Sequence, residues 1–381
     1  MAACDRTWLG GALDLVDRVM LSTWTLLTPG RRLFDNGVGD LEMLDAAEED
    51  VRKIYVGEMP LPCVTDLRWA AVSTKNGIVV EEATFDAPLA QYLPKESARA
   101  HFQFVRPVKV DDLKGIAIHS QMTADETFAW RRSMVAEELV RSGIASILLM
   151  VPFYGTRRPQ GQVMHYYRTV ADCLTGGIVA MLEAAMLAEW CKGQFPGIPV
   201  CLTGQSAGAA PAAGGALLCS GNVACVPFIG PSSGRPFCNG YMSVNVNWNR
   251  LAASIGVNSK REARAYLRDL FTRKSMIKLA DWHSNARRPE SLTVISVAGI
   301  NDGVVHPVDS LELHQVLSIF SRYTEMRWLR GGHSVLLLSR ASFIEAIRDA
   351  ISIVASDGRA RPSTNGTATS VVELQPMKET S

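Results

Sequence analysis

The sequence predicts an α/β protein with a mostly parallel central sheet that carries helices on both faces. Three features lead to this class. Strand patterns alternate with helical patterns from about residue 113, several strand patterns are apolar throughout, and the 42 residues 193–234 contain no Asp, Glu, Lys, Arg or His. Strands that are apolar on both sides are typical of a parallel sheet covered on both faces.

The overall composition excludes some functions. The chain has 381 residues, with 39 Lys and Arg against 38 Asp and Glu, and a net charge of +1. This balance argues against a nucleic-acid partner, because such binding needs a concentrated basic surface. The eight cysteines form no C-x-x-C pair and no paired histidines accompany them, so we expect reduced thiols and no bound metal.

Residues 1–60 are predicted to form an N-terminal helical segment. Apolar residues recur at helical spacing from Leu13 to Leu27, which predicts an amphipathic helix. This helix would pack on the domain or provide peripheral association with a membrane surface. Asp14 and Asp17 interrupt it, so the segment is neither a secretory signal nor a transmembrane helix by its pattern. These features favour an intracellular protein.

Residues 61–355 are predicted to form the α/β domain, with a small lid or insert at 231–291 and a disordered tail at 356–381. Short β-like runs lie within 70–110. Further strands are expected at 113–119, 144–151, 199–203, 223–229, 292–298 and 325–329. Helices are expected at 130–142, 162–192, 260–274, 311–320 and 341–354, and directly after Ser206.

The uncharged run contains the motif that indicates chemistry. A strand ending at Thr203 leads into Gly204-Gln205-Ser206-Ala207-Gly208, and an Ala-rich helical run follows. Strand, G-x-S-x-G and helix together predict a nucleophile elbow, in which small residues let the strand and the helix pass closely. The motif therefore makes Ser206 the candidate nucleophile, with the N–H of Ala207 as an oxyanion donor.

A nucleophilic serine needs a histidine base and a carboxylate that orients it, and in such folds these follow the serine in the order acid, then histidine. His333 lies just after the last predicted strand, where loops face the active edge of an open α/β sheet. Asp302 follows the strand before that one, 31 residues earlier. Both are therefore the candidate partners of Ser206.

Other residues are less well placed for these two roles. Among the histidines, His314 lies inside a predicted helix, His306 precedes Pro307, and His283 lies in the insert. Among the acids, Asp309 is expected to cap a helix, and Asp269 and Asp281 lie in or near the insert. They remain the alternatives to His333 and Asp302.

Several strings resemble the α/β-hydrolase domain-containing protein 18 family. They include the segment from His119 to Arg132, Pro152-Phe153-Tyr154-Gly155, Arg157-Arg158-Pro159, the serine motif, Val246-Asn247-Trp248 and Gly331-Gly332-His333. The resemblance covers most of residues 10–355. It implies the α/β-hydrolase fold and a serine hydrolase with the triad Ser206, Asp302 and His333, without metal or cofactor. It also implies a mitochondrial protein that removes acyl chains from phospholipids, where the residues alone indicate only a cytoplasmic one.

The loop after His119 departs from the family pattern. Two of its glycines are replaced by Met122 and Ala124. The resemblance places the second oxyanion donor in this loop, at the N–H of Gln121 or Met122. Because such a donor often requires a glycine conformation, the two replacements support an alternative function, a catalytically weak binding or scaffold protein with a hydrolase fold.

Four arginines follow predicted strand ends, and two readings of them remain. Arg131, Arg132, Arg157 and Arg158 would bind a phosphate headgroup, or they would form structural ion pairs. The function that the sequence favours is hydrolysis of carboxylic esters through an acyl-enzyme, with a small-molecule or lipid ester as substrate.

Overall fold

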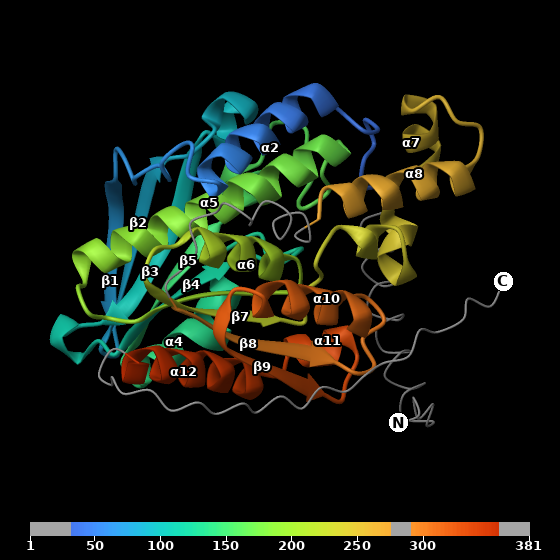
Figure 1. Ribbon diagram of the computed structural model, residues 1–381. Coiled ribbons are helices and arrows are strands. Elements are labelled where there is room, and N and C mark those ends of the chain that lie inside the picture. Colours follow the sequence, from blue (N-terminus) through green and yellow to red (C-terminus); the bar gives the residue numbers. More distant parts are fainter. Residues whose placement is uncertain (1–31, 276–290, 358–381) are drawn as a thin grey trace.

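A computed structural model describes residues 32–275 and 291–357 of the chain (Figure 1). The amphipathic helix predicted over Leu13–Leu27 and the tail from residue 358 lie outside the described residues. The last helix ends at Asp357, so the first two residues of the predicted tail, 356 and 357, are helical.

One sheet of nine strands forms the centre of the described molecule, in the order β1-β2-β3-β5-β4-β6-β7-β8-β9. β1, β2 and β3 enter through antiparallel pairings, and all pairings from β5 through β9 are parallel. The strands are β1 Arg68–Lys75, β2 Ile78–Asp86, β3 Arg99–Pro107, β4 Gly115–Ser120, β5 Ile144–Met150, β6 Val200–Gln205, β7 Asn222–Phe228, β8 Ser291–Gly299 and β9 Ser321–Leu329. The predicted mostly parallel sheet is confirmed.

Helices cover both faces of this sheet, and the described inner strands β4 to β8 are buried almost throughout (Figure 1). One face packs against α5, α6 and α10, with α2 outside α5, and the other against α4 and α12. Their bounds are α2 Leu41–Tyr55, α4 Glu137–Arg141, α5 Val170–Gln194, α6 Ala209–Leu218, α10 Pro307–Ser318 and α12 Arg340–Asp357. The uncharged run 193–234 is thus the middle of a two-sided core.

The helix predicted from residue 162 begins later, at Val170. Thr169 and Asp172 form a capping box, in which the Thr169 hydroxyl accepts from the Asp172 N–H at 3.0 Å and the Asp172 carboxylate accepts from the Thr169 N–H at 3.2 Å. This cap fixes the first turn, and residues 162–169 form a loop instead. Among the described helices, α5 is the one long and apolar enough to cross a bilayer, yet most of it is buried in the core.

The described part of the insert contains two α-helices, α7 Trp248–Ser254 and α8 Lys260–Arg273, after two short 3-10 helices. A short N-terminal segment ties it to the domain. The Leu33 N–H donates to the Asn245 carbonyl at 2.7 Å, and the Phe34 N–H donates to the Tyr167 carbonyl at 2.8 Å. Leu33 and Phe34 are fully buried, so this segment packs between the insert and the loop that precedes α5.

Candidate active site

The serine motif forms a tight strand-to-helix turn. β6 ends at Gln205, Ser206 has a φ of +52°, and α6 begins at Ala209. A non-glycine residue in this left-handed region is strained. Close backbone approach keeps it there: a Cβ on Gly204 would lie 2.2 Å from the Gly208 carbonyl oxygen, and one on Gly208 would lie 2.5 Å from the Ser120 oxygen.

Asp302 and His333 converge on this serine from the segments that follow β8 and β9. The His333 Nε2 lies 2.9 Å from the Ser206 Oγ, and its Nδ1 lies 2.7 Å from the Asp302 Oδ2. The other carboxylate oxygen of Asp302 accepts from the N–H groups of Val304 and Val305, at 2.9 and 2.8 Å. The structure therefore brings together the three side chains that the sequence analysis selected.

The alternative acids and bases lie elsewhere. The N-cap of α10 is His306, and Asp309 lies in the first turn of this helix, so the prediction that Asp309 caps it is wrong. The Asp309 carboxylate instead pairs with Arg235 at 2.8 Å. The His314 ring contacts the Ser296 hydroxyl at 3.0 Å, and Asp269 pairs with Arg273 on the surface. Asp281 and His283 lie outside the described residues.

The loop after β4 lies beside the elbow, because Ser120 pairs with Gly204 across the parallel strands. The Gln121 side chain is occupied: its Oε1 accepts from the Val151 N–H at 2.9 Å, and its Nε2 donates to the Asp125 carbonyl. The Gln121 side chain is therefore not available to an oxyanion, and the predicted donors in this loop are backbone N–H groups. Met122 and Ala207 line the same cavity as Ser206 and His333.

The two glycine replacements in this loop differ in their structural consequence. Ala124 has a φ of +69°, whereas Met122 is not among the described residues with positive φ. An alanine in the left-handed region costs about 1–2 kcal/mol. The loop thus tolerates Met122 without strain and keeps the glycine-like conformation at residue 124 at a modest cost in stability.

Two of the four arginines predicted to bind a headgroup are internal. Arg131 forms a salt bridge with Asp125 at 2.6 Å, and Arg157 forms a bidentate salt bridge with Glu183 at 2.6 and 2.8 Å. Their side chains are 4% and 2% exposed. A guanidinium buried this deeply is out of reach of an incoming phosphate, so the headgroup prediction is wrong for Arg131 and Arg157.

The other two arginines are more accessible but lie outside the cavity lining. Arg132 donates to the Gln103 Oε1 at 3.1 Å, and Arg158 pairs with Glu126 at 3.2 Å. His119, whose carbonyl accepts from Arg131, is fully buried at the end of β4, and burial, helped by the charge of Arg131, lowers its pKa to about 3. This ring is therefore neutral and adds no positive charge beside the loop.

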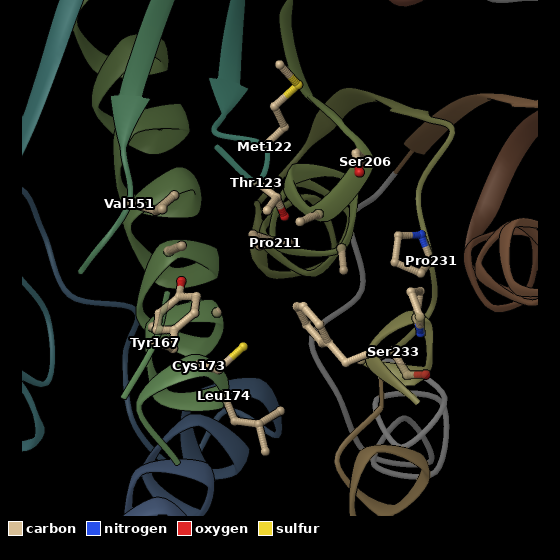
Figure 2. A pocket seen from close by; sticks show the side chains of 18 of the residues that line it. Met122, Thr123, Val151, Tyr167, Cys173, Leu174, Ser206, Pro211, Pro231 and Ser233 are labelled. Atoms are coloured by element: carbon tan, nitrogen blue, oxygen red, sulfur yellow. The ribbon is translucent and has the colours of Figure 1, made fainter. Parts of the chain in front are cut away.

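A cavity of about 410 Å³ opens from Ser206 between α5 and the start of the insert (Figure 2). Figure 2 shows Met122 and Thr123 beside Ser206, with Cys173 and Leu174 further along α5. The walls are mainly apolar and include Val151, Leu174, Ile178, Met181, Phe237 and Phe271. Lys274 also lines the cavity. Its positive charge is balanced by ion pairs with Glu48 and, at 2.6 Å, with Asp45.

The seven described cysteines are free thiols. Burial raises the pKa of Cys173, in the cavity wall, to about 12, so it behaves as a neutral apolar group. Among residues 32–275 and 291–357, no three His, Cys, Asp or Glu side chains gather as metal ligands would.

Comparison with known proteins gives a family and several distant structural neighbours. Residues 31–295 match the model of the family described as "Alpha/beta hydrolase domain containing 18". A cold-adapted esterase from an Arctic intertidal metagenomic library has 12% identity and a TM-score of 0.48, with 76% of this chain and 98% of that chain covered. Acetyl xylan esterase 1 from Thermoanaerobacterium sp. JW/SL YS485 has 13% identity and a TM-score of 0.47, with 81% and 96% covered.

Proposed function

Since the chain belongs to the alpha/beta hydrolase domain containing 18 family, we infer that it is a serine hydrolase that cleaves carboxylic esters through an acyl-enzyme on Ser206. The observation that carries this inference is the pair of hydrogen bonds joining Ser206 to His333 and His333 to Asp302. A histidine between a hydroxyl and a buried carboxylate is arranged to accept a proton from the hydroxyl.

The acylation step follows from this geometry. The Ser206 Oγ attacks the ester carbonyl while its proton passes to the His333 Nε2, and the Asp302 carboxylate stabilises the imidazolium that forms. The carbonyl oxygen becomes an oxyanion, which the N–H of Ala207 and an N–H of the 121–122 backbone stabilise. When the carbon–oxygen bond breaks, the proton on Nε2 goes to the leaving alcohol.

In deacylation, water takes the place of the serine hydroxyl as the nucleophile, and Ser206 becomes the leaving group. A water molecule gives a proton to the His333 Nε2 and attacks the acyl carbonyl, and the same N–H groups hold the second oxyanion. Collapse of this intermediate returns the proton to the Ser206 Oγ and releases the carboxylic acid. Each proton thus passes through the His333 Nε2, from the Ser206 Oγ to the leaving alcohol in acylation and from water to the Ser206 Oγ in deacylation.

The cavity supports a lipid ester as the substrate class. Its volume lies within the range typical of small-molecule sites, about 300–1,000 Å³, and its walls are mainly apolar. An acyl chain placed along α5 would bury apolar surface at about 25 cal/mol per Å². A phospholipid fits this proposal through its acyl chain, whereas Arg131 and Arg157 give no support for a headgroup site.

The experiment is a panel of esters of increasing acyl length, from acetate to palmitate, together with phosphatidylcholine vesicles. We expect the wild type to give a higher kcat/KM for long chains, and Ser206→Ala to be inactive on all of them. Leu174→Trp, which fills the cavity on α5, should lower turnover of palmitate more than that of acetate.

Two results would count against this account. Equal effects of Leu174→Trp on both esters would place the acyl chain elsewhere. A folded wild type that turns over no ester and does not react at Ser206 would favour the alternative, a hydrolase fold that acts as a binding or scaffold protein.

A further inference from the structure

Arg131 connects three parts of the molecule that meet behind the candidate oxyanion loop. Its Nη1 donates to the carbonyl of His119 at 2.8 Å and to the carbonyl of Leu149 at 2.7 Å. Its Nε donates to the Asp125 carboxylate at 2.6 Å. One planar guanidinium therefore joins the ends of β4 and β5 to the far end of the loop 121–125.

The same loop is fixed at its near end and just beyond its far end. Gln121 bridges the Val151 N–H and the Asp125 carbonyl. The Glu126 carboxylate accepts from the Gly155 N–H at 3.1 Å. Since Met122 lies between these attachments and lines the cavity with Ser206, the direction of its N–H depends on both ends of the loop.

Burial makes the Arg131–Asp125 pair sensitive to change. The two side chains are 4% and 2% exposed. Burial raises the pKa of Asp125, and the charge of Arg131 opposes that rise. The helix that carries Arg131 continues as a π-helix over Arg132–Ala136. The π-helix is rare in proteins overall, and those that occur are often found at functional sites. An ion pair that only stabilised the fold would not need to lie directly behind the loop 121–125.

We propose that Arg131 is a positioning residue that, through Asp125 and the His119 carbonyl, holds the 121–122 backbone where it can donate to the oxyanion. This proposal rests on the proposed serine hydrolase function. Arg131 itself touches no substrate, because it is buried behind the loop and does not line the main cavity. A displacement of about 1 Å at such a donor can cost on the order of 100-fold in rate.

Arg157 provides a matched control. It is equally buried, pairs with Glu183 and donates to the carbonyls of Met150 and Ser97, and none of these partners lies in the loop 121–125. Arg131→Lys and Arg157→Lys each keep a charge and lose the planar fork. Asp125→Asn is a milder variant that keeps the shape of the side chain.

The test measures steady-state ester hydrolysis and backbone amide exchange of the folded variants. Arg131→Lys and Asp125→Asn should lower kcat by about 10- to 100-fold with little change in KM, and should speed exchange over 121–126. Arg157→Lys should leave kcat within about twofold and should speed exchange over 151–158. Equal losses of kcat in the Arg131 and Arg157 variants, or unchanged exchange in the loop, would overturn the proposal.

Amide exchange also separates this proposal from the proposed function. If the wild type hydrolyses no ester, the serine hydrolase assignment fails, whereas the exchange data still decide whether Arg131 fixes the loop. If Arg131→Lys does not fold, Asp125→Asn carries both measurements.

Discussion

Asp302→Asn is expected to lower kcat on the order of 10⁴-fold while the fold remains intact. The Asn oxygen would keep the contacts that the Asp302 Oδ1 makes with the N–H groups of Val304 and Val305. Its amide nitrogen would then face the His333 Nδ1 and donate to it. The ring proton would have to sit on Nε2, which lies 2.9 Å from Ser206 and could no longer accept the serine proton.

Asp309→Asn is the control for this prediction, measured by the same kinetics and by thermal unfolding. Asp309 is also buried and lies seven residues further along, but it pairs with Arg235 rather than with a histidine. We expect kcat to change by less than about threefold in this variant, since the pair of Asp309 with Arg235 takes no part in the proton transfer. A comparable loss in both variants would mean that Asp302 acts through the fold and not through His333.

Gly204→Ala is expected to have the largest effect on the fold. The added Cβ would lie 2.2 Å from the carbonyl oxygen and 2.4 Å from the carbonyl carbon of Gly208. Both are backbone atoms between β6 and α6, so neither can move without opening the elbow. We expect the free energy of unfolding to fall by more than about 3 kcal/mol, the upper end of ordinary overpacking, as measured by denaturant unfolding.

Gly193→Ala provides the opposite outcome in the same assay. A Cβ on Gly193, in the last turns of α5, would meet no atom within 4 Å. Alanine is the better helix former by about 0.5–1 kcal/mol, so this variant should be slightly more stable than the wild type. If Gly204→Ala were as stable as Gly193→Ala, the close crossing of β6 and α6 would not exist.

The sequence predicted the fold class and the meeting of Ser206, Asp302 and His333 for a common reason. Buried parallel strands leave long apolar runs, and loops at their carboxyl ends lie on one edge of the sheet. Residues that follow β6, β8 and β9 are therefore neighbours whatever their separation in the chain. The G-x-S-x-G motif added the backbone detail, since the φ of +52° at Ser206 is the conformation that its flanking glycines permit.

The prediction missed other features, most of them because they depend on contacts that form only in the folded chain. Arg131 and Arg157 look like surface cations in the sequence, but their partners Asp125 and Glu183 become visible only when the chain is folded. The late start of α5 depended on the capping box at Thr169, a signal that was readable in the sequence as Thr-x-x-Asp. The strain at Ala124 required its backbone angles.

The most direct test of Ser206 as the nucleophile is the intact mass of the protein after treatment with a fluorophosphonate, followed by mapping of the modified peptide. We expect one adduct, on Ser206, that forms in the wild type, is strongly slowed in Asp302→Asn, and is missing in Ser206→Ala. An adduct that forms equally in Ser206→Ala, or a wild type whose folded form takes up none, would contradict the assignment of Ser206 as the nucleophile.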